Sequence, residues 1–171
     1  MFKVTALIGL LWGCSMLGAV KSLSLKERIR LLEDYLKLML EIKSNINYFR
    51  QPLVNIRPEK GSDCFSEAYN LFNAISLELK QKEAEIGEIW AKNVDRIYRD
   101  TQLKPDDIEL FKYAGSFIGQ TDYENHLARF EYLEERLEKQ INAARDNYNK
   151  QGPLYRKLGL FAGVLAVIIF I

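Results

Sequence analysis

Two uncharged apolar runs enclose a long amphipathic middle region. The first run covers residues 4–20, and the second covers residues 158–171, or 154–171 if the chain breaks at Gly152-Pro153. At about 1.5 Å of rise per residue, a helix over the longer version spans roughly 27 Å, close to the roughly 30 Å of a bilayer's hydrocarbon layer. After Lys157 no polar residue appears at the spacing that a helix with one wet face requires. We therefore predict a membrane helix from each run.

Other interpretations of the two runs stay open. A short basic start before an apolar stretch also describes a cleaved signal peptide, and Leu11–Cys14 resembles a bacterial lipobox. The second run could instead be a buried helix of a soluble domain or a removed glycosylphosphatidylinositol-anchor signal. The large Trp12, the poor cleavage pattern near Gly18 and the bulky, charged residues 154–157 disfavour the signal, lipoprotein and anchor interpretations.

Glycines four residues apart occur in both runs, at Gly9 and Gly13 and at Gly159 and Gly163. This spacing forms a smooth groove that lets another helix backbone approach closely in lipid, where van der Waals contact drives association. We predict that these glycines pack membrane helices together, either within the chain or between chains in a homo-oligomer.

Positive charges flank both runs on the side of the middle region, whereas the outer side has only Lys3. The positive-inside rule then places residues 21–157 in the cytoplasm. The middle region has as many Lys and Arg as Asp and Glu, so it gives no reason to expect nucleic acid. Two cysteines, Cys14 and Cys64, cannot make a disulfide framework, which fits a reduced compartment.

Apolar residues recur at steps of three and four through the middle region, and no stretch alternates with period two. The first long helix is predicted to begin at a capping box, Ser24 with Glu27, and to end at Pro52. Further helices are predicted over residues 65–81, about 90–100, 105–118 and 121–148. The predicted fold is all-α, with an antiparallel helical bundle over 21–153 flanked by transmembrane helices over 1–20 and 154–171.

The middle region carries few residues patterned for chemistry. It has no Gly-rich phosphate loop followed by Lys, no Cys or His pair at metal-ligand spacing and no GxSxG motif. His126, the only histidine, follows Asp122 by one helical turn, and an enzyme would have to use this pair. A solvated or capping interaction is the simpler interpretation. We therefore expect no catalytic site, no metal and no cofactor.

Two further groups have ordinary structural interpretations. Glutamates spaced like metal carboxylates alternate with basic residues on the last predicted helix, which favours a solvated, salt-bridged face. These are Glu131, Glu134, Glu135 and Glu138, with Arg129, Arg136 and Lys139 among them. Gly115, Gly119 and Asp122 form a GxxxGxxD elbow between two predicted helices, and the residues alone favour a tight helix junction there.

Five short motifs occur in order along the chain. They are Glu27-Arg28 with Arg30; Ile46, Tyr48, Pro52 and Leu53; Trp90; Gly115, Gly119 and Asp122; and Arg156, Leu158-Gly159 and Ala162-Gly163. Together with the two apolar runs, they make the chain resemble the stage III sporulation protein AB family of endospore-forming bacteria over almost its whole length. The family's usual EIxYxxTPL stretch is altered here, because Asn45 replaces Glu and Gln51 replaces Thr, so no role is assigned to those two positions.

The resemblance implies a membrane component of the complex that joins the mother cell to the forespore during engulfment. It also implies a helical domain similar to the cytoplasmic domain of the type II secretion F protein, the membrane platform on which a hexameric secretion ATPase acts. The implied partner is the sibling ATPase, stage III sporulation protein AA. The implied location is the cell membrane of the mother cell.

Taken together, these features predict a nonenzymatic scaffold whose partners are this ATPase, other membrane components of the complex and lipid. Tyr48, Pro52 and Leu53, and the elbow at Gly115, Gly119 and Asp122, are the candidate partner-contact residues, since both places are loop-like and carry the resemblance. Each could equally serve folding alone. The alternative function is a membrane-anchored helical sensor or signalling coupler, which would need a ligand pocket or an attached output domain, and the sequence shows neither.

Overall fold

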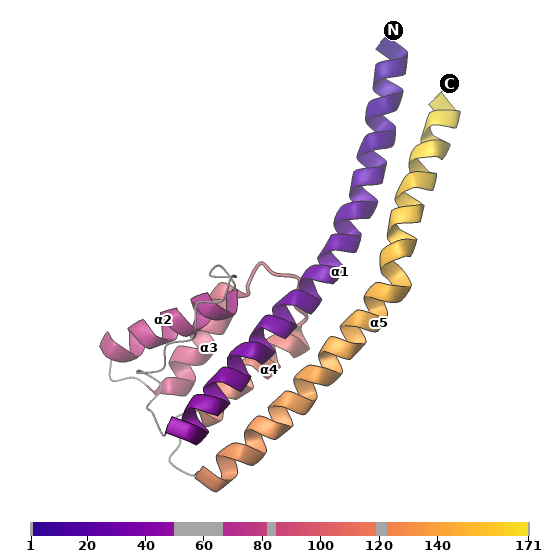
Figure 1. Ribbon diagram of the computed structural model, residues 1–171. Coiled ribbons are helices and arrows are strands. Elements are labelled where there is room, and N and C mark those ends of the chain that lie inside the picture. The colour runs from indigo at the N-terminus through magenta and orange to yellow at the C-terminus, as the bar shows by residue number, and fades with distance from the viewer. Residues whose placement is uncertain (1, 50–66, 82–84, 119–122, 171) are drawn as a thin grey trace. The chain divides into compact units, whose positions relative to one another are not determined.

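The computed structural model describes residues 2–49, 67–81, 85–118 and 123–170, without the side chains of 2–8, 10, 11, 47–49, 123–126 and 170. These ranges form five helices and contain no strand, which confirms the predicted all-α fold (Figure 1). The helices are α1 (Phe2–Phe49), α2 (Glu67–Gln81), α3 (Ile86–Ile97), α4 (Pro105–Phe117) and α5 (Tyr123–Phe170).

Helix α1 is 48 residues long and continues without a break past the end of the first apolar run. The predicted capping box is therefore wrong. Ser24 lies inside the helix, where its hydroxyl donates a hydrogen bond to the carbonyl of Lys21 at 2.8 Å instead of capping a helix start. No Gly or Pro lies between Val20 and Ser24, so nothing in the sequence ends the helix there.

Helix α5 is also 48 residues long and has Pro153 in its interior, so the predicted break at Gly152-Pro153 is wrong as well. An interior proline removes one backbone hydrogen bond and costs a helix roughly 3 kcal/mol. The helix is closely packed just before this proline, at Gly152. A Cβ built at Gly152 would lie 3.0 Å from the Tyr148 ring and 3.4 Å from the Ser22 hydroxyl oxygen.

The chain divides by its packing into two compact units. The first, called the helix pair here, consists of Met1–Ile29 and Asn142–Ile171. The second, called the bundle, consists of Arg30–Ile141. Helices α1 and α5 each contribute one segment to both units. The predicted limits of the lipid-embedded segments, at residues 20 and 154, stay predictions.

The bundle has a core to which all five helices contribute, and α3 packs against both α2 and α4. Its largest fully buried side chains are Trp90, Tyr35, Phe72, Phe111, Phe117, Leu31, Leu32, Ile42, Leu71, Ile75, Leu133 and Leu137. Burying a large apolar side chain stabilises a fold by about 1.5–3 kcal/mol. The apolar faces predicted from the helical periodicity are therefore the faces that hold the bundle together.

Candidate functional site

Among the predicted partner-contact residues, Gly115 is the one that the structure describes in full. Four of the others lie outside the described residues: Pro52, Leu53, Gly119 and Asp122. The side chains of Tyr48 and His126 also lie outside the description. The contact roles proposed for them stay predictions.

Gly115 lies inside α4, buried against Trp90 of α3. A Cβ built at Gly115 would lie 2.5 Å from both Cβ and Cγ of Trp90, closer than real side-chain carbons approach one another. No larger residue fits unless the two helices move apart. Gly115 therefore allows α3 and α4 to pack closely, and it is not exposed at the surface of the bundle.

Trp90 and Tyr35 donate hydrogen bonds to the same backbone oxygen. Trp90 Nε1 lies 2.9 Å, and the Tyr35 hydroxyl 2.7 Å, from the carbonyl oxygen of Phe111. The Tyr35 ring also stacks on the Phe111 ring, with centroids 3.6 Å apart and planes 7° apart. Because these residues come from α1, α3 and α4, this cluster fixes three helices to one another in the interior.

Tyr98 closes one side of the same cluster, with its ring edge-to-face against Phe111 at 5.0 Å between centroids. Its hydroxyl is buried and has no hydrogen-bond partner among the described residues. Burial raises the pKa of Tyr98 strongly, and the carboxylates of Glu67 and Asp34 raise it further. Burial also raises the pKa of Tyr35. Both phenols therefore stay neutral around neutral pH, and neither is ready to act as a base.

Charged residues of the bundle pair with one another between and along the helices. Lys43 of α1 contacts Glu134 of α5 at 2.9 Å, and both side chains are partly shielded from water. On the outer face of α5, Lys139 donates to Glu135 at 2.6 Å, and this hydrogen bond lowers the pKa of Glu135. Glu135 thus makes a salt bridge of the kind that the sequence favours along α5, whereas Glu134 pairs with α1. No group of three potential ligands in the described part of the chain could hold a metal ion.

The helix pair contains a backbone contact that the sequence analysis missed. A Cβ built at Gly18 would lie 2.5 Å from the carbonyl oxygen of Tyr155 and 3.1 Å from the Cα of Gly159. A Cβ built at Gly159 would lie 2.9 Å from the carbonyl oxygen of Cys14. Cys14, Gly18 and Ser22 recur every four residues, so a search for small residues in general would have found this face of α1.

The predicted GxxxG glycines therefore differ in their surroundings. Gly159 lies in the contact with α1, and Gly163, one turn further along α5, is buried. Gly9 and Gly13 are exposed, and a Cβ built at either would meet no described atom within 4 Å. In α1 the close approach is made by Gly18, one and a half turns beyond the predicted pair.

A polar contact lies next to these glycines. The Ser22 hydroxyl is fully buried, and Arg156 Nε donates a hydrogen bond to its oxygen at 3.1 Å. Because Ser22 belongs to α1 and Arg156 to α5, this bond joins the two helices of the pair. A charge-assisted bond of this kind also satisfies a buried hydroxyl oxygen that would otherwise destabilise the contact.

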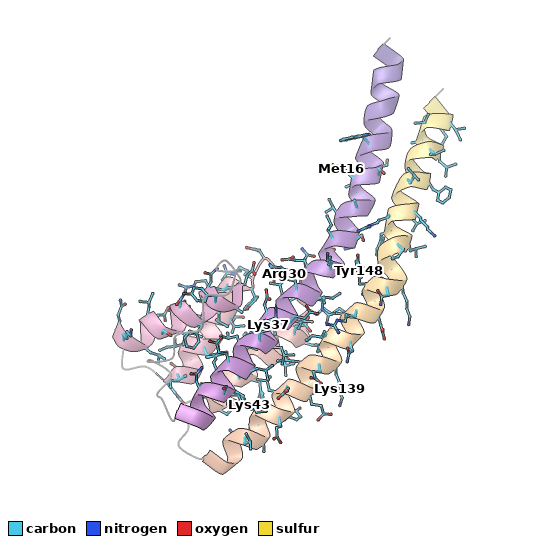
Figure 2. All side chains as sticks on the ribbon, in the orientation of Figure 1. Met16, Arg30, Lys37, Lys43, Lys139 and Tyr148 are labelled. Carbon is cyan, nitrogen blue, oxygen red and sulfur yellow. The ribbon has the colours of Figure 1, made fainter. Side chains whose placement is uncertain are left out.

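Large apolar side chains point outward from both helices of the pair (Figure 2). They include Trp12, Met16, Leu17, Val20 and Leu23 in α1 and Leu154, Leu158, Leu160, Phe161, Leu165, Ile168 and Ile169 in α5. Within the described residues, α5 alone contains a segment long and apolar enough to cross a membrane, in Leu127–Ile169. Most side chains of the first eleven residues lie outside the description, so the N-terminal span stays a prediction.

A family model described as stage III sporulation protein AB matches residues 3–171. The chain belongs to the stage III sporulation protein AB family. This confirms the resemblance inferred from the sequence and indicates a role in stage III of sporulation. No curated protein and no solved structure matches the chain.

Several residues that carried the resemblance to the stage III sporulation protein AB family make contacts between helices. Trp90 packs against Gly115, and Arg156 and Gly159 both contact α1. In the structure, these motif residues hold helices together in the bundle and in the helix pair. In this chain their contacts are therefore structural.

Proposed function

We propose that this protein is a nonenzymatic membrane scaffold of the complex between mother cell and forespore. Both apolar runs anchor it in the mother-cell membrane, and its bundle lies in the cytoplasm as a platform for a secretion-type ATPase and other members of the complex. The observation that carries this proposal is the family match over residues 3–171, which indicates a sporulation role for the whole chain.

The surface of the helix pair supports membrane anchoring. Leu158, Phe161 and Ile169 of α5 are 53%, 64% and 77% exposed, although the backbones of α1 and α5 touch at Gly18. Exposure of such an apolar surface to water would be unfavourable, whereas contact of the same surface with lipid chains is not. Ten of residues 158–171 are Leu, Ile, Val or Phe, each worth about −0.3 to −0.6 kcal/mol near a bilayer centre.

The bundle has a well-packed core that can support a surface for partners. The aromatic cluster around the Phe111 carbonyl lies inside the bundle, and its phenols are neutral, which fits a structural role better than acid–base chemistry. The ATPase as partner comes from what the family resemblance implies. Binding to a rigid surface requires little ordering of the scaffold itself, which favours affinity.

Membrane anchoring and topology can be tested together in sporulating cells. The full-length protein should resist extraction by alkaline carbonate. A cysteine at position 77, where Leu77 is 59% exposed in the bundle, should react with an impermeant maleimide only after protoplasts are opened. Cys14 and Cys64 are replaced by serine in this variant. Labelling of position 77 from outside intact protoplasts would contradict the proposed cytoplasmic bundle.

The platform role can be tested with purified components. The full-length protein in lipid nanodiscs should bind the stage III sporulation protein AA ATPase saturably and have no ATPase activity of its own. Empty nanodiscs serve as the control. Absence of binding under conditions in which both proteins are folded would reject the scaffold role proposed here.

A further inference from the structure

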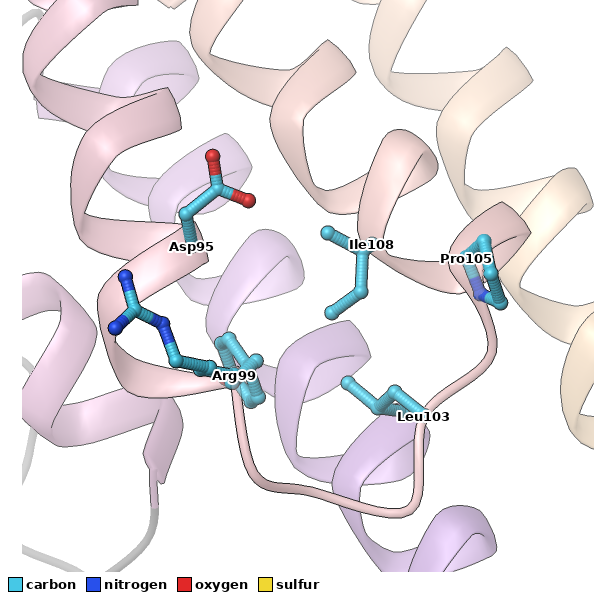
Figure 3. A pocket seen from close by; sticks show the side chains of 6 residues that line it. Asp95, Arg99, Leu103, Pro105 and Ile108 are labelled. Atoms are coloured by element: carbon cyan, nitrogen blue, oxygen red, sulfur yellow. The ribbon is translucent and has the colours of Figure 1, made fainter.

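A pocket of about 480 Å³ lies in the bundle where α3 leads into α4. Its lining residues are Asp95, Tyr98, Arg99, Leu103, Pro105 and Ile108 (Figure 3). In Figure 3, Asp95 of α3 and Arg99, in the turn just after α3, lie on one side, and Ile108 and Pro105 of α4 lie on the other, with Leu103 in the connection below. The pocket thus has an apolar wall opposite a charged one.

Hydrogen bonds hold the walls of this pocket in place. The carbonyl of Tyr98 accepts bonds from the N–H and the hydroxyl of Thr101 at 3.3 and 2.8 Å. The carbonyl of Lys104 accepts bonds from the N–H groups of Asp107 and Ile108 at 3.0 and 3.2 Å. The connection between α3 and α4 is therefore preformed, and a ligand would not have to order it.

Two charged residues line the pocket, and they differ in whether they have an ionic partner. Asp95 forms an ion pair with Lys112 at 2.6 Å. The buried carboxylate of Asp107 accepts a hydrogen bond from the Lys104 N–H at 2.9 Å. Arg99 is exposed and, among the described residues, has neither a hydrogen bond nor an ion pair. The pocket therefore presents one unpaired cation beside apolar side chains.

This chemistry fits a carboxylate better than a phosphate. Phosphates bind where several backbone N–H groups at a helix start point at them. Here Pro105 at the start of α4 has no N–H, and the Asp107 carboxylate already occupies that positive end. A single guanidinium can still bind one carboxylate through two parallel hydrogen bonds.

A protein segment fits the pocket better than a small molecule. Asp95, Arg99 and Pro105 are all exposed at its edge, so it is wide open to solvent. Small-molecule sites usually enclose about 70–90% of the ligand surface, which an open pocket cannot do. A large side chain on a partner surface needs to bury only one face.

We infer that this pocket receives a segment of the cytoplasmic partner in which an aliphatic or aromatic side chain stands next to a carboxylate. The apolar side chain packs on Leu103, Pro105 and Ile108, and the carboxylate pairs with Arg99. This inference rests on the proposed function, because it places the ATPase of the scaffold complex at this pocket.

The test measures binding of the stage III sporulation protein AA ATPase to the full-length protein in nanodiscs. Ile108→Arg should raise Kd at least about tenfold, because it puts a charge against the apolar side chain at the centre of the contact. Arg99→Glu should raise Kd about fivefold at low salt and less at high salt, because added ions screen an exposed pair. Melting curves confirm that both variants are folded.

Two matched variants outside the pocket serve as controls. Leu77→Arg adds the same charge on an exposed apolar position of α2, and Lys80→Glu reverses an exposed cation at the end of that helix. Both should change Kd by less than about twofold, as substitutions outside a contact usually do. A peptide arm uses overlapping peptides of the ATPase. In the peptide that competes, Glu→Gln or Asp→Gln should weaken binding to the wild type but not to Arg99→Gln.

The outcomes separate this inference from the proposed function. If the ATPase binds the wild type and all four variants equally, the pocket is not its docking site, and the scaffold role stands. If the ATPase does not bind the wild type, both fall. If Ile108→Arg instead abolishes self-association of the protein without ATPase, as sedimentation would show, the pocket receives a second copy and the inference is overturned.

Discussion

In the helix pair, α1 and α5 meet through backbone atoms at Gly18 and Gly159, whereas the bundle is held by large buried side chains such as Trp90 and Phe111. The helix pair carries many large apolar residues on its surface and has glycines where its two helices meet. The bundle instead buries its largest apolar residues in its core. In water the hydrophobic effect favours the burial of apolar area, whereas in lipid it does not. Helices in a membrane are therefore held together mainly by close van der Waals contact.

This contrast shows that two continuous helices can follow two sets of packing rules along their length. Residues 25–46 of α1 have the repeating apolar face of a water-soluble bundle, whereas the preceding turns present the small residues Gly18 and Ser22 to α5. The change occurs without a loop, because the helical backbone satisfies its own hydrogen bonds in both surroundings.

The largest expected effect comes from removing the centre of the bundle core. Trp90→Ala should destabilise the bundle by about 3–5 kcal/mol, since it leaves a cavity and removes the hydrogen bond to Phe111. Hydrogen exchange of the α3 and α4 amides in nanodiscs measures this loss. The distance between spin labels at positions 16 and 161, both in the helix pair, should stay unchanged. A change in this distance as well would contradict the view that the bundle and the helix pair are held by different contacts.

A bulky residue at Gly18 should open the helix pair and leave the bundle intact. Gly18→Ile should destabilise the contact between α1 and α5 by about 1–3 kcal/mol, as overpacking of a close contact does. The distance between spin labels at positions 16 and 161, in a background without the native cysteines, should lengthen.

Gly13→Ile is the matched control, because a side chain at Gly13 meets no described atom within 4 Å. It should leave the spin-label distance unchanged. Equal widening in both variants would show that Gly18 has no special place in the contact.

Two tyrosines of the bundle differ in whether their hydroxyl has a hydrogen-bond partner. Removing the two hydroxyls should therefore change the free energy of unfolding in different directions. Tyr35→Phe should destabilise by about 1 kcal/mol, because it removes a buried hydrogen bond to the carbonyl of Phe111. Tyr98→Phe removes a buried hydroxyl that has no partner among the described residues, so it should be neutral or stabilising. Urea unfolding of the full-length variants measures both changes, and a greater loss for Tyr98→Phe would contradict this assignment.

The smallest expected effect concerns an exposed ion pair of the bundle. The hydrogen bond from Lys139 holds the pKa of Glu135 below its ordinary value of 4.5. The carboxylate therefore contributes stability above pH 4.5, and this is lost as the pH falls through the lowered pKa of the folded state.

In Lys139→Gln the pKa of Glu135 should rise towards its ordinary value. A carbon-detected NMR titration of the full-length protein measures it. Stability at neutral pH should hardly change, because exposed pairs contribute little. A large loss of stability would show that surface ion pairs contribute more to the stability of the bundle than expected for a fold held by its buried core.

Much of the bundle follows from the sequence because its helices repeat apolar residues at helical spacing. That spacing predicted α2 to within two residues and α4 to within one. The breaks expected at Ser24 and Pro153 were wrong, since local capping and proline signals are weaker than a helix that continues on both sides. Whether a helix continues through such a position depends on its contacts with other helices, and a local motif does not show these contacts.

The candidate sites were less predictable than the helices. The Gly18 contact was missed because its neighbours in the repeat are Cys14 and Ser22 instead of glycines. The hydrogen-bond cluster at Phe111 uses a backbone carbonyl, an acceptor that every residue has, so no side-chain pattern indicates it. The pocket beside Arg99 depends on the fold of a short connection, which brings Leu103 opposite α3.

The contact between Gly18 and Gly159 also has a consequence for biosynthesis. A ribosome makes the chain from its N-terminus, so the first apolar segment emerges long before the segment that pairs with it. In the membrane arrangement that we propose, this segment enters the lipid alone, before the intervening domain has been translated. Closure of the contact between Gly18 and Gly159 is therefore a late step of assembly.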